Sequence, residues 1–125
     1  MRNSASIRVK SDDAEVLFLW HGFDGDDCFN DFRIEISNRS GTERFDFGGC
    51  VVWGLRKLVW FFRGKLDKAG GGFRFPDIRT YDLTRTEDGY LLQISLETAN
   101  RSEQIRLSNP TLIMDDEFLR DYDGN

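Results

Sequence analysis

The chain has 125 residues, of which 39% are hydrophobic and 31% charged. This size and composition favour a single domain over residues 1–125 and exclude disordered and collagen-like chains. Its longest apolar runs are far shorter than the roughly 20 residues that a membrane-spanning helix requires. Residues 1–10 are polar and charged, so we expect no signal peptide. Two cysteines make no disulfide framework, which favours the cytoplasm.

The net charge of −5 is unevenly distributed along the chain. Residues 11–31 contain seven acidic and no basic residues, whereas residues 50–74 contain six basic residues and a single acidic one. Residues 111–125 are acidic again, with five acidic residues and one arginine. Acidic segments repel phosphate backbones, so we expect no nucleic-acid partner. A basic protein partner suits this charge pattern better.

Alternating apolar and polar residues predict strands through the first 47 residues. Residues 6–10 read as an edge strand. Residues 15–20 are apolar on both faces, which predicts a central strand buried on both sides. Residues 32–47 form two alternating segments around a four-residue turn at 38–41, which is typical of a β-hairpin.

The second half of the chain repeats this pattern. Residues 78–86 and 90–98 flank a turn that contains Gly89, so they predict a second hairpin. Residues 103–107 add another strand, which we expect Pro110 to end.

A helix is predicted between the two hairpins, over residues 51–66. Apolar side chains recur there at spacings of three and four, which places them on one stripe that would lie on the sheet. Ala69 and Gly70 offer a C-terminal cap, and residues 70–72 read as the exit from the helix. A second, short helix is predicted over residues 115–122. The predicted fold is α+β, with an antiparallel meander of six to seven strands packed on one long amphipathic helix and a short C-terminal helix.

The predicted helix carries aromatic and basic residues on the side opposite its apolar stripe. Such a face is typical of an interaction hot spot. Two interpretations stay open, because either residues 112–119 fold over this face or a partner covers it. This helix face and an acidic loop that suits a cationic partner together form the candidate interface, which consists of Trp53, Arg56, Trp60, Arg63, Asp24, Asp26 and Asp27.

No catalytic, metal-binding or cofactor-binding motif is recognised. The acidic loop resembles a calcium loop, and Glu35 stands at the twelfth position, but Phe29 occupies the position that requires glycine. His21 is the only histidine and has no nucleophile motif beside it. The cysteines, Cys28 and Cys50, lie in no CxxC motif. We therefore predict no catalytic residue, metal or cofactor, and favour a binding module over an enzyme.

The order of elements resembles that of small bacterial immunity proteins of polymorphic toxin systems, the WapI type among them. It consists of the acidic loop, the Phe-rich hairpin, the amphipathic helix and the second meander. The resemblance implies a cytoplasmic protein that binds and neutralises a toxin, and an acidic surface would suit a basic nuclease toxin. Two alternatives stay open. One is a homo-oligomer that buries Trp53, Trp60 and Phe61, and the other is a small-ligand binder or enzyme with a cleft between sheet and helix near His21.

Overall fold

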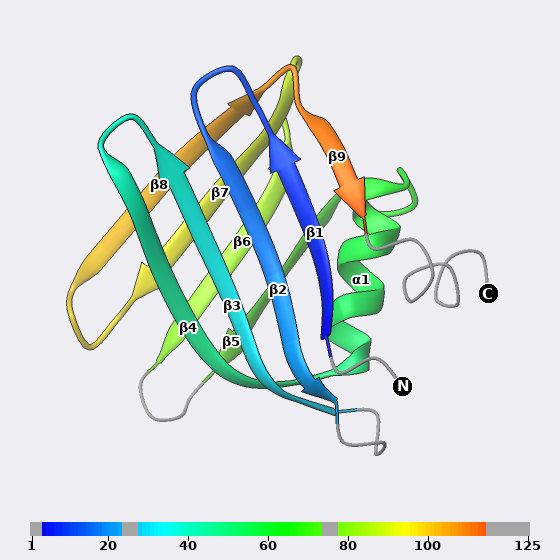
Figure 1. The fold of residues 1–125 in the computed structure, drawn as a ribbon, viewed down its shortest axis with the longest axis vertical. Coiled ribbons are helices and arrows are strands. Elements are labelled where there is room, and N and C mark those ends of the chain that lie inside the picture. Colours follow the sequence, from blue (N-terminus) through cyan, green and yellow to red (C-terminus); the bar gives the residue numbers. More distant parts are fainter. Residues whose placement is uncertain (1–3, 24–27, 74–77, 115–125) are drawn as a thin grey trace.

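The computed structural model describes the backbone of residues 4–23, 28–73 and 78–114 (Figure 1). Side chains are described for these residues except 4, 22–23, 28–30, 48–56 and 72–73.

The described residues form nine strands in two antiparallel sheets and one helix. The five-stranded sheet has the order β4-β3-β2-β1-β9. Its strands are β1 (Ser4–Lys10), β2 (Glu15–Phe23), β3 (Cys28–Asn38), β4 (Gly41–Val51) and β9 (Thr111–Met114). The four-stranded sheet has the order β5-β6-β7-β8. Its strands are β5 (Lys68–Phe73), β6 (Arg79–Arg85), β7 (Gly89–Leu96) and β8 (Arg101–Ser108).

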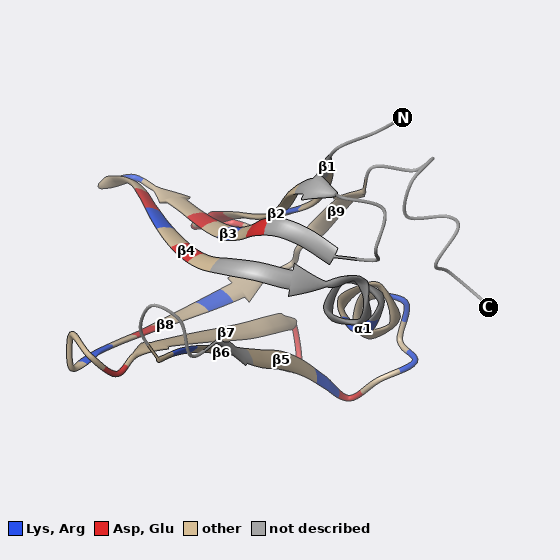
Figure 2. Cartoon of the chain, turned by 90° about the horizontal axis from the view of Figure 1, so that it is seen from below, with Lys and Arg blue, Asp and Glu red and all other residues tan. Residues whose placement is uncertain are grey.

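The two sheets stack face to face around one core, and helix α1 (Val52–Phe62) lies between them at one end (Figure 2). Aromatic rings join the layers. Phe32 of the first sheet stacks on Trp20 at 5.0 Å between ring centroids and contacts Tyr81 of the second sheet at 5.4 Å. Two apolar sheet faces that bury each other define a sandwich.

The predicted α+β fold, with a meander packed on a long helix, is therefore wrong. The helix has 11 residues and fills one end of a two-sheet structure. Because α1 contacts both layers, its buried face is wider than one stripe: Leu58, Val59 and Phe61 are fully buried and Phe62 nearly so. Phe62 meets Phe18 of the first sheet at 5.9 Å and Tyr90 of the second at 5.2 Å. The helix was predicted to pack on one sheet, so the contact of α1 with the second sheet was not expected from the sequence.

The helix also ends earlier than predicted, and Gly64 is the reason. This residue has φ +83°, the left-handed conformation that glycine adopts without steric cost. The amide of Gly64 donates to the carbonyl of Phe61 at 3.0 Å, and the amide of Lys65 donates to that of Trp60 at 2.8 Å. These two bonds form a Schellman cap. The glycines at 70–72, expected at the helix exit, belong to β5 instead.

Several strand predictions need smaller corrections. Strand β1 is not an edge, because β9 pairs with its outer side. Strand β2 is the middle strand of its sheet, but only one face is fully buried, since Leu17 and Leu19 on the other face are half-buried. Asn38 pairs with Gly41, so the first hairpin has a two-residue loop. The second hairpin is confirmed, with Leu92 and Ile94 fully buried.

The C-terminal region is described only as far as Met114. Strand β8 ends at Ser108, before Pro110 as predicted, and the chain then forms a further strand, β9, at residues 111–114 beside β1. The segment that was one candidate cover for the helix thus begins as a strand of the five-stranded sheet. The predicted helix at 115–122 lies outside the described residues.

Candidate functional site

A cleft of about 370 Å³ opens at the end of the sandwich away from α1. The β3-β4 hairpin, residues 36–45, forms one wall, and β8 forms the other through Glu103 and Ile105. In Figure 1 the hairpin projects past the line of β8, and residues of both elements line the cleft.

The walls of this cleft combine apolar and acidic groups. Ile36 and Phe45 are buried at 6% and 3% exposure, and Ile105 is half-buried. Two carboxylates accompany them, and no basic residue lines the cleft in the described chain. Glu43 lies opposite Ile36 in the β3-β4 ladder, and Glu103 lies opposite the buried Ile94 in the β7-β8 ladder. Both glutamates therefore occupy positions in phase with the apolar face.

Both strands that border the cleft are sheet edges. Among the described strands, β8 pairs only with β7 and β4 only with β3. An edge strand presents backbone N–H and C=O groups that no neighbouring strand uses. The cleft thus brings together apolar surface, two carboxylates and backbone groups of a strand edge.

Arg101 connects the two walls at the mouth of the cleft. Its Nη2 lies 2.6 Å from Oε1 of Glu103 and also bonds Oε2 of Glu43 on the opposite sheet. Its guanidinium lies 5.5 Å from the centre of the Phe45 ring. Hydrogen bonds that Arg101 donates to the two carboxylates, to Glu103 foremost, raise the pKa of Arg101. The arginine therefore holds both acids at the cleft.

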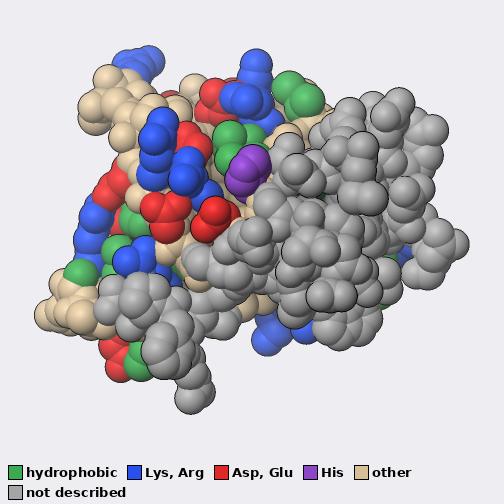
Figure 3. All heavy atoms as spheres, turned by 60° about the horizontal axis from the view of Figure 1, so that its bottom comes forward, with side chains coloured by type: hydrophobic (Ala, Val, Ile, Leu, Met, Phe, Trp, Pro, Cys, Tyr) green, Lys and Arg blue, Asp and Glu red, His purple; other side chains and the backbone are tan. Residues whose placement is uncertain are grey.

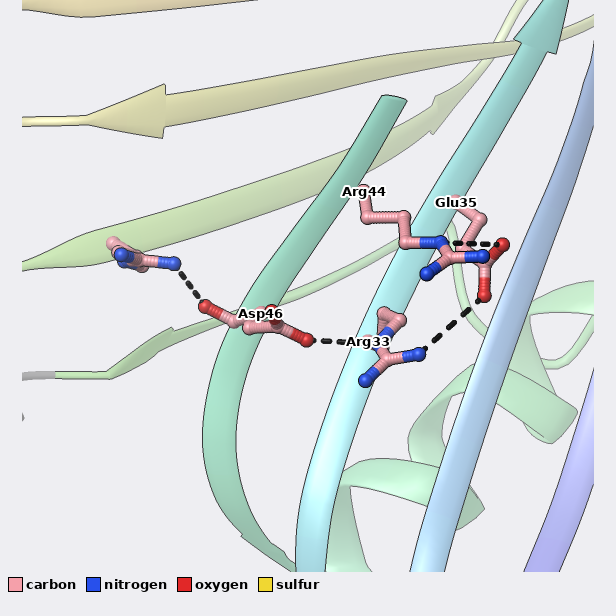
Figure 4. A network of polar contacts seen from close by, with 5 residues as sticks. Arg33, Glu35, Arg44 and Asp46 are labelled. Carbon is pink, nitrogen blue, oxygen red and sulfur yellow. Dashed lines mark hydrogen bonds and ion pairs between the residues drawn. The ribbon is translucent and has the colours of Figure 1, made fainter. Parts of the chain in front are cut away.

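A second polar cluster lies on the outer face of the five-stranded sheet (Figure 4). Nε of Arg33 donates to Oδ1 of Asp46 at 2.8 Å, and Arg44 lies 3.4 Å from Glu35. The hydrogen bond that Arg33 donates to Asp46 is the main reason that the pKa of Arg33 is raised. Glu35 thus lies in a strand between two arginines, which opposes the calcium-loop interpretation.

His21 lies on this outer face, where Figure 3 shows it beside charged side chains. It pairs with Asp31 across β2 and β3, and a hollow of about 280 Å³ is lined by Leu19, His21, Asp31 and Arg33. This hollow, with three polar residues in its lining, lies on the outer face of the sheet, whereas the predicted cleft was placed between the sheet and the helix.

The predicted helix face is described only in part. Trp60 is half-buried and Arg63 is exposed, whereas Phe61, expected on the outside for the homo-oligomer, is fully buried. It packs on Tyr90 at 5.5 Å, and Arg85 lies over its ring. The side chains of Trp53, Arg56, Cys28 and Cys50, and the acidic loop with Asp24, Asp26 and Asp27, lie outside the described residues.

The described residues include no group of three or more His, Cys, Asp or Glu side chains arranged to hold a metal ion. Nor does any helix in this part of the chain have the length and apolar character needed to cross a bilayer.

No protein family, curated protein or solved structure matches the chain. The resemblance to WapI-type immunity proteins therefore stays a prediction.

The cleft was missed from the sequence, although a signal for it is present. In β4 the inward positions are Glu43, Phe45 and Phe47, and in β8 they are Glu103, Ile105 and Leu107. Each series begins with an acidic residue in phase with apolar ones. A charge at an inward position indicates that the strand extends beyond the closed core.

Proposed function

We propose that the chain is a non-catalytic protein-binding module whose partner docks at the cleft between the β3-β4 hairpin and β8. The observation that supports this is the pair Glu43 and Glu103, two carboxylates at inward positions of two sheet edges. Arg101 supplies one positive charge for these two carboxylates, so one negative charge is left to attract a cationic group of a partner.

A basic protein is the partner that this cleft favours. In one form of the proposal the chain is a cytoplasmic immunity protein that neutralises a basic toxin, as the resemblance implies. The acidic composition supports this form, because attraction between opposite charges accelerates the encounter and makes binding salt-dependent.

The test is affinity capture from a lysate of the source organism, with retained proteins identified by mass spectrometry. Three baits are compared: the wild type, the cleft variant Glu43→Gln/Glu103→Gln, and the control Glu87→Gln/Glu97→Gln, which removes the same charge from exposed turns. We expect one basic protein that the wild type and the control retain and the cleft variant loses. Equal retention by all three baits would contradict the cleft as the docking site, and no retained protein would contradict the function.

The hollow at His21 favours a second candidate function, the binding of a small polar ligand. Leu19 supplies an apolar contact, and His21, Asp31 and Arg33 supply donors and acceptors within one hollow. The test is a screen of a fragment library by changes in the His21 ring signals. A ligand that binds the wild type and not His21→Ala would support this function.

A further inference from the structure

We propose that the partner presents an extended segment that adds to β8 as a fifth strand of the second sheet, with cationic and apolar side chains alternating along its inward face. This inference rests on the proposed function and specifies the chemistry of the partner at the same cleft.

The geometry of the two sheets supports strand addition. Neighbouring strands lie about 4.8 Å apart. A strand placed beside β8 would run beneath the overhanging β3-β4 hairpin, in the volume of the cleft. It would give the second sheet five strands, the number in the sheet that covers it.

Strand β8 is the best of the four edges for such an addition. It has eight residues and one side without a strand neighbour in the described chain. The other edge of its sheet, β5, lies against α1, and β9 has only four residues. At the remaining edge, β4, a backbone carbonyl is already used, because Arg79 of β6 donates a hydrogen bond to the carbonyl oxygen of Asp46.

The cleft walls define the side chains of the added strand. Every second residue of that strand would point inward, toward the hairpin. Beside Ile105, and beneath Ile36 and Phe45, an apolar side chain is favoured. Two positions further along, beside Glu103 and below Glu43, a Lys or Arg is favoured, because these two carboxylates share a single cation, Arg101, and one negative charge is left over. The intervening residues would face solvent.

A synthetic peptide with this pattern of side chains tests strand addition directly. The probe has nine residues, with Thr at odd positions and Val and Lys alternating at even positions, and blocked ends. One control replaces Lys by Glu, and another carries N-methyl groups at alternate backbone amides, which removes strand pairing and keeps the side chains. Amide spectra of labelled protein report binding, and hydrogen exchange reports new protection along β8.

We expect saturable binding of the Lys peptide, with slower exchange at every second amide of β8. Two ion pairs at an exposed site are worth about tenfold in affinity, so the Glu peptide and the variant Glu43→Gln/Glu103→Gln should each weaken binding by about this factor. The N-methylated peptide should not bind.

Three results would overturn the inference. Equal binding of the N-methylated peptide would exclude strand addition, and protection of β8 in a concentration-dependent dimer without peptide would assign this edge to a second copy of the chain. No saturable binding of the Lys peptide would exclude the proposed chemistry. In each case the lysate experiment still decides the proposed function, because its bait variants report docking at the cleft by any mode.

Discussion

The two ends of the sandwich differ in what occupies the inward positions of their strands and helix. At the end that α1 closes, the inward side chains are aromatic and aliphatic, and Phe61 and Phe62 pack on Tyr90. At the other end, Glu43 and Glu103 stand at strand positions in phase with the inward apolar side chains, and Arg101 forms an ion pair with each of them. Apolar groups exclude water and hold the sheets together, whereas exposed ion pairs add little to stability and leave the cleft accessible.

This difference separates stability from binding along the same sandwich. The closed end should dominate the free energy of unfolding, and the open end should dominate recognition. The predictions test that separation.

The largest expected effect is at the closed end. Phe61→Ala removes a fully buried ring from the space between the sheets, so it should lower the free energy of unfolding by about 3–5 kcal/mol. Ile105→Ala, at the half-buried cleft wall, should cost well under half of that. Urea denaturation of both variants measures the contrast. Equal losses would contradict the division between the two ends.

Gly89→Ala tests the β7-β8 ladder at the end away from Arg101, where Gly89 of β7 pairs with Ser108 of β8. A Cβ at residue 89 would lie 1.9 Å from the carbonyl oxygen of Leu107 and 2.9 Å from Cδ of Pro110. Because the nearest atom belongs to the backbone, the ladder between β7 and β8 must shift, at a cost of about 1–3 kcal/mol or more. Thermal unfolding measures this loss. A wild-type stability would show that the corner is looser than the geometry requires.

The sequence predicted the strands well and the arrangement of the sheets poorly. Alternation identified both hairpins because half-buried strands have a period of two, and alternate residues of β7, Leu92 and Ile94, are indeed fully buried. Alternation does not say which sheet a strand joins. The strand β9 is four residues long and pairs with β1, about a hundred residues earlier, and a local pattern carries no information on such a contact.

The helix and the site were missed for related reasons. The extent of α1 depends on Gly64, which lies inside the predicted helix over residues 51–66 because the 3.6-residue apolar period continues past it. Phe61 fell outside the single stripe because the second sheet was not foreseen. The cleft results from two strands that overhang each other, so neither strand alone indicates it, although the inward Glu43 and Glu103 do.

Gly64→Ala tests how the closed end is terminated. Apart from residue 64 and its two chain neighbours, no atom lies within 4 Å of the added methyl group, so the cost is conformational: residue 64 keeps φ near +83°. An L residue in this conformation costs about 1–2 kcal/mol. Gly64→Asn should cost less than Ala, because asparagine adopts left-handed backbone more readily. Denaturation of the two variants gives the order, and a cost for Asn above that for Ala would contradict the cap.

The smallest effect on stability is expected at Arg101, where the effect on binding should be clear. Arg101→Gln removes the cation that Glu43 and Glu103 share at the exposed mouth of the cleft. Exposed ion pairs contribute little to folding, so the unfolding midpoint should barely move. The two carboxylates would then interact with a partner's cation alone, and affinity for the Lys peptide should rise about two- to fivefold. Weaker binding would show instead that Arg101 positions the glutamates, so that their orientation matters more than their charge. An increase or a decrease in peptide affinity therefore decides whether the open end binds through the charge of the two glutamates or through their orientation by Arg101.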